Sequence, residues 1–193
     1  MKKFKLTSEF IVDISGVKLF RIKALIEFGN VKAGDLGGYI EKEENLSHMG
    51  NAWVSGNAQV SGDARVFGDA RVFGNAQVSG DAQVFGDARV FGNAWVSGNA
   101  QVSGNAQVSG DAQVFGDARV SGDKDYAYAH GFGSCNRTTT FFRLKDGDVG
   151  VRCGCFYGTL AQFRDNVCET HGETKKAQEY LMLADLMDFR FKN

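Results

Sequence analysis

The side chains best suited to bind a small molecule lie close together, between residues 130 and 138. They are a histidine, two hydroxyl residues, an amide and a guanidinium: His130, Ser134, Asn136, Arg137 and Thr138. Arginine beside an amide and a run of threonines offers the donors that bind a phosphate or a nucleotide. Because the same residues also suit a solvated strand start, the sequence favours that plainer interpretation and leaves the five as ligand-binding candidates.

Thiol chemistry is the second possibility in this part of the chain. The cysteines are Cys135, Cys153, Cys155 and Cys168, and His171 could complete a zinc site with them. The C-x-C spacing differs from that of zinc knuckles, and Cys168 is expected on the apolar side of a helix. A cysteine–histidine nucleophile pair would lack a third, orienting group. We therefore expect packed thiols, with no metal, no cofactor and no catalytic residue.

These side chains must be positioned by a C-terminal domain, residues 123–193. The segments DYAYAHGFGS and RTTTFFRLKDGDVGVRCGCF predict strands, with a hairpin turn at 145–148. Thr159 and Gly172 are typical first and last residues of a helix. That helix has Leu160, Phe163 and Val167 on one face, and a second helix after Thr174 has Ala177, Tyr180, Leu181, Ala184 and Met187 on one side. The pattern predicts a compact α+β domain.

A six-residue repeat occupies the middle of the chain, residues 50–122. From Gly50 to Ser121 the pattern G-[N/D]-A-x-V-[S/F] occurs twelve times without a gap. Alanine and valine, two positions apart, point to one side of a short strand, and the residues that follow each of them point to the other. Glycine with asparagine or aspartate favours a corner. The repeat predicts a coil with alanine and valine inside.

The size of each coil follows from a longer period. Residues 69–86 and 87–104 are nearly identical, so three hexads make one 18-residue turn. About four turns then form a parallel β-helix shaped as a triangular prism. Each face should carry its own outward ladder of side chains. On the first face, Trp53, Arg71, Arg89 and Gln107 follow one another.

Exposed aromatic residues beside arginines are the most informative departures from uniformity. Contiguous apolar patches are rare on monomers and are typical of interface cores. We expect these side chains to be covered by a sister subunit or by the terminal segments; tolerated surface aromatics and a direct binding site remain the alternatives. The interface candidates are Phe67, Phe73, Phe85, Phe91, Arg71 and Arg89.

The six-residue repeat resembles that of hexapeptide-repeat proteins, whose fold is a left-handed parallel β-helix. Left-handedness is implied by this resemblance alone, because the general rule for parallel crossovers favours the right hand. The resemblance also brings in acyltransferases and zinc-dependent carbonic anhydrases, which use histidines. Residues 50–121 contain no His, Glu, Cys or Lys. The coils therefore lack the groups for either reaction, and an acyltransferase-like enzyme is only an alternative function.

Residues 1–49 are expected to form a β cap on the open edge of the stack. SEFIVDI-SG-VKLFRIKAL predicts a hairpin with its turn at Ser15 and Gly16. KLTSEF, LFRIKALIEFGNVKAGDLGGYIEKEENLS and GNAWVSGNA resemble the N-terminal part of a group of phage and prophage proteins, and GFGSCNRTTTFF, CGCFYGTLAQF and ETHG resemble tails of phage proteins. This resemblance implies an origin in a virus or mobile element and names no reaction.

Composition narrows the function classes further. The 22 basic and 23 acidic side chains give no net field to attract nucleic acid, and we expect no membrane partner and a cytoplasmic location in the host cell. We expect a homo-oligomer, either a trimer or a dimer. The favoured function is a non-catalytic binding or scaffold protein of a phage, in its most specific form a counter-defence protein that binds a host immune protein or sequesters a nucleotide signal. A virion structural or adhesin component is a further alternative.

Overall fold

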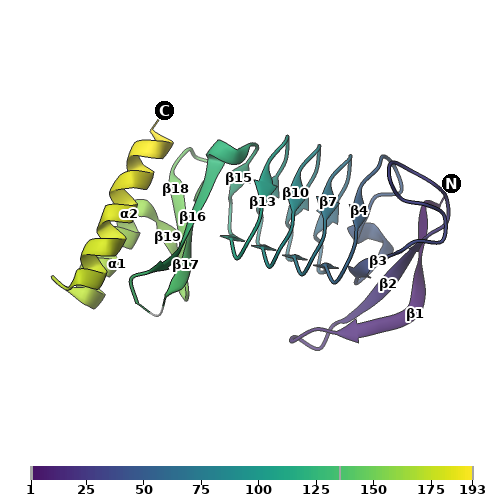
Figure 1. Ribbon diagram of the computed structural model, residues 1–193, viewed down its shortest axis with the longest axis horizontal. Coiled ribbons are helices and arrows are strands. Elements are labelled where there is room, and N and C mark those ends of the chain that lie inside the picture. Colours follow the sequence, from purple (N-terminus) through teal and green to yellow (C-terminus); the bar gives the residue numbers. More distant parts are fainter. Residues whose placement is uncertain (1, 135, 193) are drawn as a thin grey trace.

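The computed structural model describes residues 2–134 and 136–192 and shows a mainly β rod with a different unit at each end (Figure 1). The middle of the rod is a parallel β-helix, as the repeat predicts. The chain enters at the N-terminal unit, winds along the rod and ends in two helices at the far end. No helix of the described residues is both long and apolar enough to span a membrane.

Twelve two-residue strands form the coils. They are β4 (Trp53–Val54), β5 (Gln59–Val60), β6 (Arg65–Val66), β7 (Arg71–Val72), β8 (Gln77–Val78), β9 (Gln83–Val84), β10 (Arg89–Val90), β11 (Trp95–Val96), β12 (Gln101–Val102), β13 (Gln107–Val108), β14 (Gln113–Val114) and β15 (Arg119–Val120). Every third strand pairs in parallel, so that β4, β7, β10 and β13 make one face, β5, β8, β11 and β14 the second, and β6, β9, β12 and β15 the third. The predicted 18-residue turn is therefore confirmed.

The core of the rod is a column formed by the alanine and valine side chains of the repeat. Every alanine and every valine of the hexads is at most 1% exposed. The corners are tight because successive glycines stack on one another. Gly92 has φ +73°, and a Cβ there would lie 2.9 Å from the backbone nitrogen of Gly110. Only glycine can therefore stand at such a corner without moving the next coil.

Outside the strand pairs, the hydrogen bonds between coils all point the same way; within each pair, the parallel ladder also contains bonds in the opposite direction. The N–H of Gln59 donates to the carbonyl of Ala76 in the next coil at 2.9 Å, and Arg89 donates to Ala106 in the same manner. The first coil is therefore left mainly with free carbonyl groups, and the fourth coil is left mainly with free N–H groups. Each end needs a cap of the opposite kind.

The N-terminal unit covers the carbonyl end. β1 (Phe4–Val12) and β2 (Lys18–Ala24) form an antiparallel hairpin with the predicted turn, closed by Asp13 and Val17. β3 (Leu36–Ile40) pairs with β2 on one side and lies parallel to β5 on the other. After the 3-10 turn η1 (Glu43–Asn45), Leu46 bridges to Val66 in parallel. Parallel pairing thus begins before the sequence period does and extends the β-helix to about five turns.

Two buried side chains complete this cap. The Lys3 ammonium donates to the carbonyls of Ala52 at 2.8 Å and Gly50 at 3.3 Å. The Asn45 amide donates to the carbonyls of Ala64 at 2.9 Å and Gly62 at 3.0 Å. The cap also buries Trp53, which is 4% exposed and meets Phe28 edge to face at 5.4 Å. Trp53 keeps its predicted place on the outward side of the prism, where it pairs with Arg71, but residues outside the repeat cover this end of the face.

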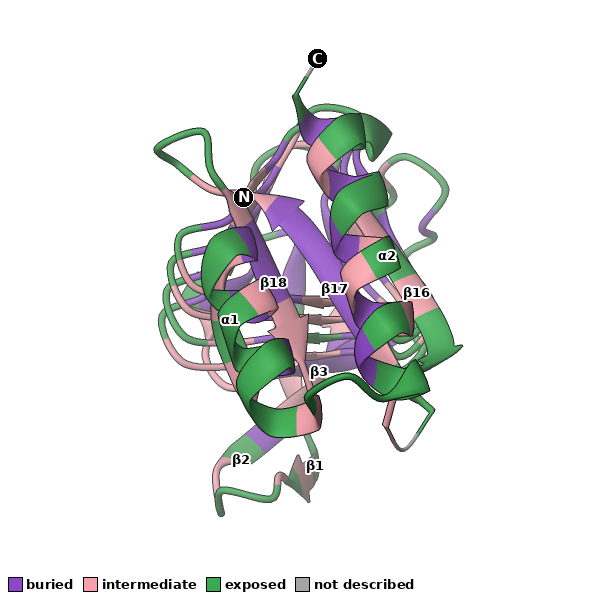
Figure 2. Cartoon of the chain, turned by 90° about the vertical axis from the view of Figure 1, so that its left-hand side faces the viewer, coloured by how far each residue is buried: buried purple, intermediate pink, exposed green. Residues whose placement is uncertain are grey.

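The C-terminal unit covers the N–H end. After the 3-10 turn η2 (Asp123–Asp125), the antiparallel strands β16 (Tyr126–Phe132), β17 (Arg137–Arg143), β18 (Val149–Cys153) and β19 (Phe156–Thr159) form a sheet in chain order. The helices α1 (Leu160–His171) and α2 (Lys175–Phe191) pack on that sheet, and their outer surfaces are exposed at the tip of the rod (Figure 2). Thr159 and Thr174 cap the helices, and Gly172 ends α1, as predicted.

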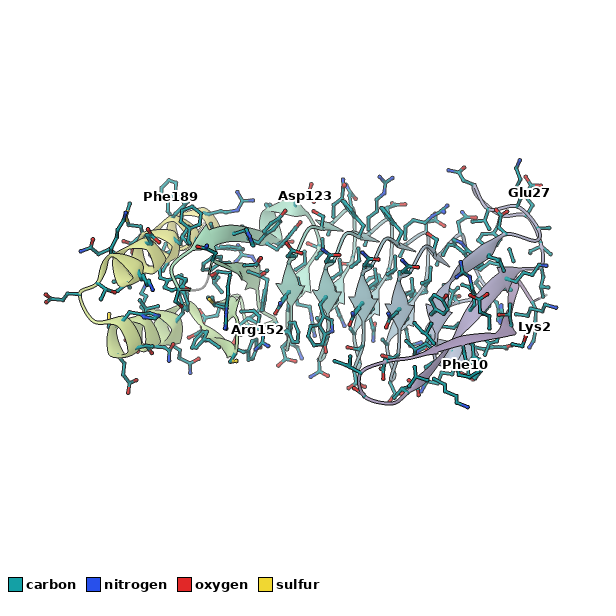
Figure 3. All side chains as sticks on the ribbon, turned by 60° about the horizontal axis from the view of Figure 1, so that its bottom comes forward. Lys2, Phe10, Glu27, Asp123, Arg152 and Phe189 are labelled. Atoms are coloured by element: carbon teal, nitrogen blue, oxygen red, sulfur yellow. The ribbon has the colours of Figure 1, made fainter. Side chains whose placement is uncertain are left out.

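Acceptor side chains from this unit meet the free N–H groups of the last coil. The Asp123 carboxylate accepts from Gln107 N at 3.0 Å, and the Thr140 hydroxyl accepts from Gln113 N at 2.9 Å. The Asp125 carboxylate accepts from Ser121 N at 2.9 Å, from the Ser121 hydroxyl and from Gly122 N. Asp123 lies at the junction of the rod and this unit, at the opposite end from Lys2 (Figure 3).

Candidate functional site

The ligand-binding candidates of the C-terminal unit lie around the far ends of β16 and β17, but they do not converge on one point. Exposed His130 contacts the Thr138 hydroxyl at 2.9 Å across the two strands. Asn136 is exposed and has φ +47°, as a turn residue does. Arg137 is exposed and lies beside Gly154, where a Cβ would stand 2.2 Å from its guanidinium. These side chains therefore make neighbouring surface contacts and no enclosed pocket.

Ser134 is the candidate that reaches the interior. Its backbone N–H donates to the Tyr180 hydroxyl at 3.0 Å, and its own hydroxyl lies 3.3 Å from the same oxygen. Burial raises the pKa of Tyr180, against the opposing effect of the Ser134 hydroxyl. A neutral tyrosine that anchors a turn explains this contact, so Ser134 serves the fold of the unit.

Of the three described cysteines, only Cys153 fits the prediction of packed thiols. Cys153 is half-buried, with Thr139 Oγ1 at 3.2 Å from its sulfur, whereas Cys155 and Cys168 are exposed. The expectation that Cys168 lies on the apolar side of α1 is wrong, because that side is already formed by Leu160, Phe163 and Val167. The described residues contain no cluster of three or more potential metal ligands. Cys135, a member of the conceivable zinc set, lies outside the described residues.

The six interface candidates form one continuous surface, which we call the aromatic face: Phe67, Phe73, Phe85, Phe91, Arg71 and Arg89. Phe67 and Phe85 lie on the corner that precedes the first prism face, and Phe73 and Phe91 lie on the corner that follows it. Each pair stacks in parallel with ring centroids 4.9 Å apart, at interplanar angles of 2° and 0°. The sequence assigned the phenylalanines to two prism faces; both pairs lie on corners that border the first face, which carries Arg71 and Arg89.

The arginines of the aromatic face stand between the two rows of rings. Arg71 and Arg89 are direct partners in the parallel pairing of β7 and β10. Like charges in such positions repel each other. Neither guanidinium forms an ion pair with any carboxylate of residues 2–134 and 136–192. Arg71 lies against Gly29 of the N-terminal unit, while Arg89 is exposed.

A hollow at the border of the aromatic face is the feature that sequence reasoning missed. It is wide open to solvent, has a volume of about 410 Å³ and lies between the fourth coil and the C-terminal unit. Its lining residues are Phe91, Gln107, Ser109, Asp123, Tyr126, Ala127, Tyr128 and Arg190. Arg190 comes from the end of α2, where its guanidinium donates to the carbonyl of Asp123 at 3.2 Å. The only sequence signal was the alternation of Tyr126 and Tyr128 in a strand directly after the repeat.

A second hollow, of about 340 Å³, lies beneath the tip of the β1–β2 hairpin. The second prism face forms its floor, where Trp95 donates to the Ser79 hydroxyl at 3.3 Å. The hairpin tip supplies Asp13, Ile14 and Ser15. Ile14 is fully exposed, so the tip does not close onto the rod.

Comparison with known families agrees with the fold. The sequence matches the YdcK beta solenoid repeat at residues 58–74, 64–80, 82–98 and 100–114. All four matched segments fall within the coils. The search of curated proteins gave no match. The chain therefore contains a β-solenoid repeat of a recognised kind, and the match does not extend to the units at either end.

Proposed function

We propose that the protein is a non-catalytic, oligomeric binding and scaffold protein in which the rod is a rigid spacer and the aromatic face joins copies of the chain. The observation that carries the proposal is the aromatic face itself. Four phenylalanine rings in two parallel stacks flank two arginines on one flat, regular surface. Aromatic residues and arginine are the types most enriched at the centres of protein interfaces.

Charge complementarity favours a second copy of this chain as the partner. Asp69 and Asp87 are exposed and stand two positions before Arg71 and Arg89, at the corners that lead into β7 and β10. In a two-fold symmetric dimer, the same surface of both subunits forms the interface. Each residue then contacts residues of the other subunit that lie near its own counterpart there. The aspartates of one copy can then neutralise the arginines of the other, and this relieves the repulsion between Arg71 and Arg89.

The test is the mass of the assembly in solution. Phe73→Ser/Phe91→Ser removes one stacked pair and introduces the residue that the repeat already has at this position in Ser55 and Ser109. We expect wild type to elute as a dimer or trimer and the double variant to dissociate, as measured by size-exclusion chromatography with light scattering. A monomeric wild type, or an unchanged mass in the variant, would contradict the proposal.

The control is Phe189→Ser on α2. Phe189 is 73% exposed and lies on α2, outside the aromatic face and at the opposite end of the rod from Lys2 (Figure 3). The substitution removes an equally apolar ring from the surface. We expect the mass of the assembly to stay that of wild type, which separates an effect of the aromatic face from a general change in solubility.

The finer part of the proposal concerns the biological setting. The resemblance of residues 5–10, 19–47 and 50–58 to phage and prophage proteins supports an origin in a phage, and a counter-defence role is the most specific function in line with it. A pull-down from infected-host lysate with mass spectrometry tests this role. Recovery of a host immune protein or a bound nucleotide signal would support it, whereas turnover of acetyl-CoA by the purified protein would overturn it.

A further inference from the structure

A ladder of aromatic rings along one corner of the rod is interrupted at one position. Phe73 and Phe91, in consecutive coils, stack in parallel with centroids 4.9 Å apart. The corresponding residue of the next coil is Ser109, whose side chain ends at a hydroxyl. The ring face of Phe91 on that side therefore has no following phenylalanine.

Aromatic rings resume beyond the gap. Tyr128 lies against the next glycine of this corner, since a Cβ on Gly110 would stand 2.6 Å from the Tyr128 hydroxyl. Tyr126 stacks on Tyr128 with centroids 6.5 Å apart, and its hydroxyl donates to the carbonyl of Gln107. Phe91 thus borders the gap on the side of the coils, and the tyrosines border it on the side of the C-terminal unit.

The gap coincides with the 410 Å³ hollow. Besides the rings, its lining offers hydrogen-bonding groups of both kinds: the Gln107 amide, the Ser109 hydroxyl, the Asp123 carboxylate and the Arg190 guanidinium. One Asp123 oxygen is engaged by Gln107 N and Arg190 donates to a backbone carbonyl, so both groups are held in place at the rim. The lining of the hollow therefore combines aromatic rings with polar groups.

We propose that this hollow binds a planar heteroaromatic ring, which takes the place of the missing rung between Phe91 and Tyr128. A flat ring matches the parallel geometry that the Phe73–Phe91 pair already shows, and stacking on aromatic side chains is tolerant of the particular ring. Nitrogen and oxygen atoms at the edge of a heterocycle can pair with Gln107, Asp123 and Arg190. A nucleobase and an indole share this chemistry. The site goes beyond the proposed oligomerisation, because Ser109 and the tyrosines lie outside the aromatic face.

The test uses adenosine and indole as probes and ribose as the ring-free control. Titration of ¹⁵N-labelled full-length protein, followed by NMR, gives a dissociation constant for each probe. We expect adenosine or indole, or both, to bind with shifts that map to the hollow, and ribose not to bind. Which of the two binds more tightly identifies the source of the ring.

Ser109→Phe is the diagnostic variant, because it fills the gap with the ring that the repeat has in Phe73 and Phe91. We expect it to abolish binding of both probes. Ser103→Phe is the matched control: it makes the same change one coil earlier, after Phe85 on the other aromatic corner, and lies outside the hollow. It should leave affinity unchanged. Phe91→Ser, which removes one of the rings on which the ligand would stack, should weaken binding by about tenfold or more.

Several results would overturn the proposal. They are no binding of either probe to wild type, ribose binding as tightly as adenosine, or Ser109→Phe and Phe91→Ser binding as wild type does. Light scattering on the same variants measures assembly separately. A protein that binds the ring but stays monomeric would contradict the proposed oligomer alone, and an assembled protein that ignores both probes would contradict the ring site alone.

Discussion

The two ends of the coil stack are capped by opposite hydrogen-bonding chemistry. At the N-terminal end, Lys3 and Asn45 donate to carbonyl groups of the first coil. At the C-terminal end, Asp123, Asp125 and Thr140 accept from N–H groups of the last coil. The difference arises because most bonds between coils run from an N–H of one coil to a carbonyl of the next one along the chain, which gives the stack a polarity.

This polarity explains why the two caps are built so differently. The carbonyl end is met partly by β3, whose backbone N–H groups continue the parallel pairing through Tyr39 and Ala58. The N–H end is met by an antiparallel unit that does not continue the coil, so side-chain oxygens take over at the junction. Exchanging the donors and acceptors at either end should therefore cost far more than an ordinary polar substitution.

Asn45→Asp breaks the comparison most directly. The side chain is fully buried and its amide faces two carbonyl oxygens, so a carboxylate would replace two attractive contacts by repulsive ones. We expect the free energy of unfolding to fall by about 3 to 4 kcal/mol, measured by chemical denaturation.

The control for this substitution is Asn57→Asp. Asn57 is exposed, and the repeat already places aspartate at the same position in Asp63 and Asp81. We expect a change of at most about 0.5 kcal/mol. Equal effects of the two substitutions would show that the carbonyl end has no special need for donors.

Asp125→Asn tests the acceptor end. The Asp125 carboxylate gathers three hydrogen bonds from Ser121 and Gly122, and Arg143 lies 3.7 Å from its other oxygen. An amide keeps one acceptor oxygen but loses the charge, so we expect a loss of about 1 to 3 kcal/mol. Asp81→Asn, at an exposed corner, should change stability little. A neutral result at Asp125 would mean that the antiparallel unit holds the junction without this carboxylate.

The sequence predicted the rod well because its evidence is local and repeated twelve times. Period, coil size and the inward residues all follow from alternation within six residues. The C-terminal helices were predicted for the same reason, since caps and apolar spacing are short-range signals. Phe67 and Phe85 were correctly paired, although the prism face that they border became clear only from the arrangement of the corners.

The side-chain contacts within the caps, and the hollow, could not be predicted, because they depend on residues that are distant in the sequence. Lys3 reaches acceptors 47 and 49 positions away, and Arg190 lies 67 positions from Asp123. Nothing in the sequence marks Lys3 as buried, since lysine is usually exposed. The residues that cover Trp53 could not be predicted for the same reason, because they lie outside the repeat.

Stability should rise with pH at both ends of the stack, but in different pH ranges. Burial, with Arg71 nearby, lowers the pKa of Lys3 from 10.5 to about 8. Between these values the unfolded chain binds a proton that the folded chain lacks, so stability rises with pH, by at most about 1.4 kcal/mol per unit. Burial alone would raise the pKa of Asp125, but the bonds from Ser121 and Gly122 and the nearby Arg143 lower it below 3.8. Its contribution is present above that pH and is lost as the pH falls through the lowered pKa.

Trp53 fluorescence reports the carbonyl end, because this ring is buried under the N-terminal unit. Trp95→Gln, which introduces the residue of Gln59 and Gln77, leaves Trp53 as the single tryptophan. Denaturation at pH 7.5, 8.5 and 9.5 should show rising stability in this background and no rise after Lys3→Met. A rise that survives the loss of Lys3 would assign the effect to another group.

Thr140→Val makes the smallest change and isolates one bond of the acceptor end. Thr140 is fully buried on β17, and its hydroxyl is the acceptor for Gln113 N. Valine keeps the shape and the strand preference and removes only the oxygen, so we expect a loss of about 1 kcal/mol and faster hydrogen exchange at Gln113. Thr138→Val, two positions earlier on the same strand, removes a hydroxyl that meets exposed His130 and should leave Gln113 protected. Unchanged exchange at Gln113 in Thr140→Val would mean that this N–H needs no side-chain acceptor, and the contrast between the two ends would then rest on Asp123 and Asp125 alone.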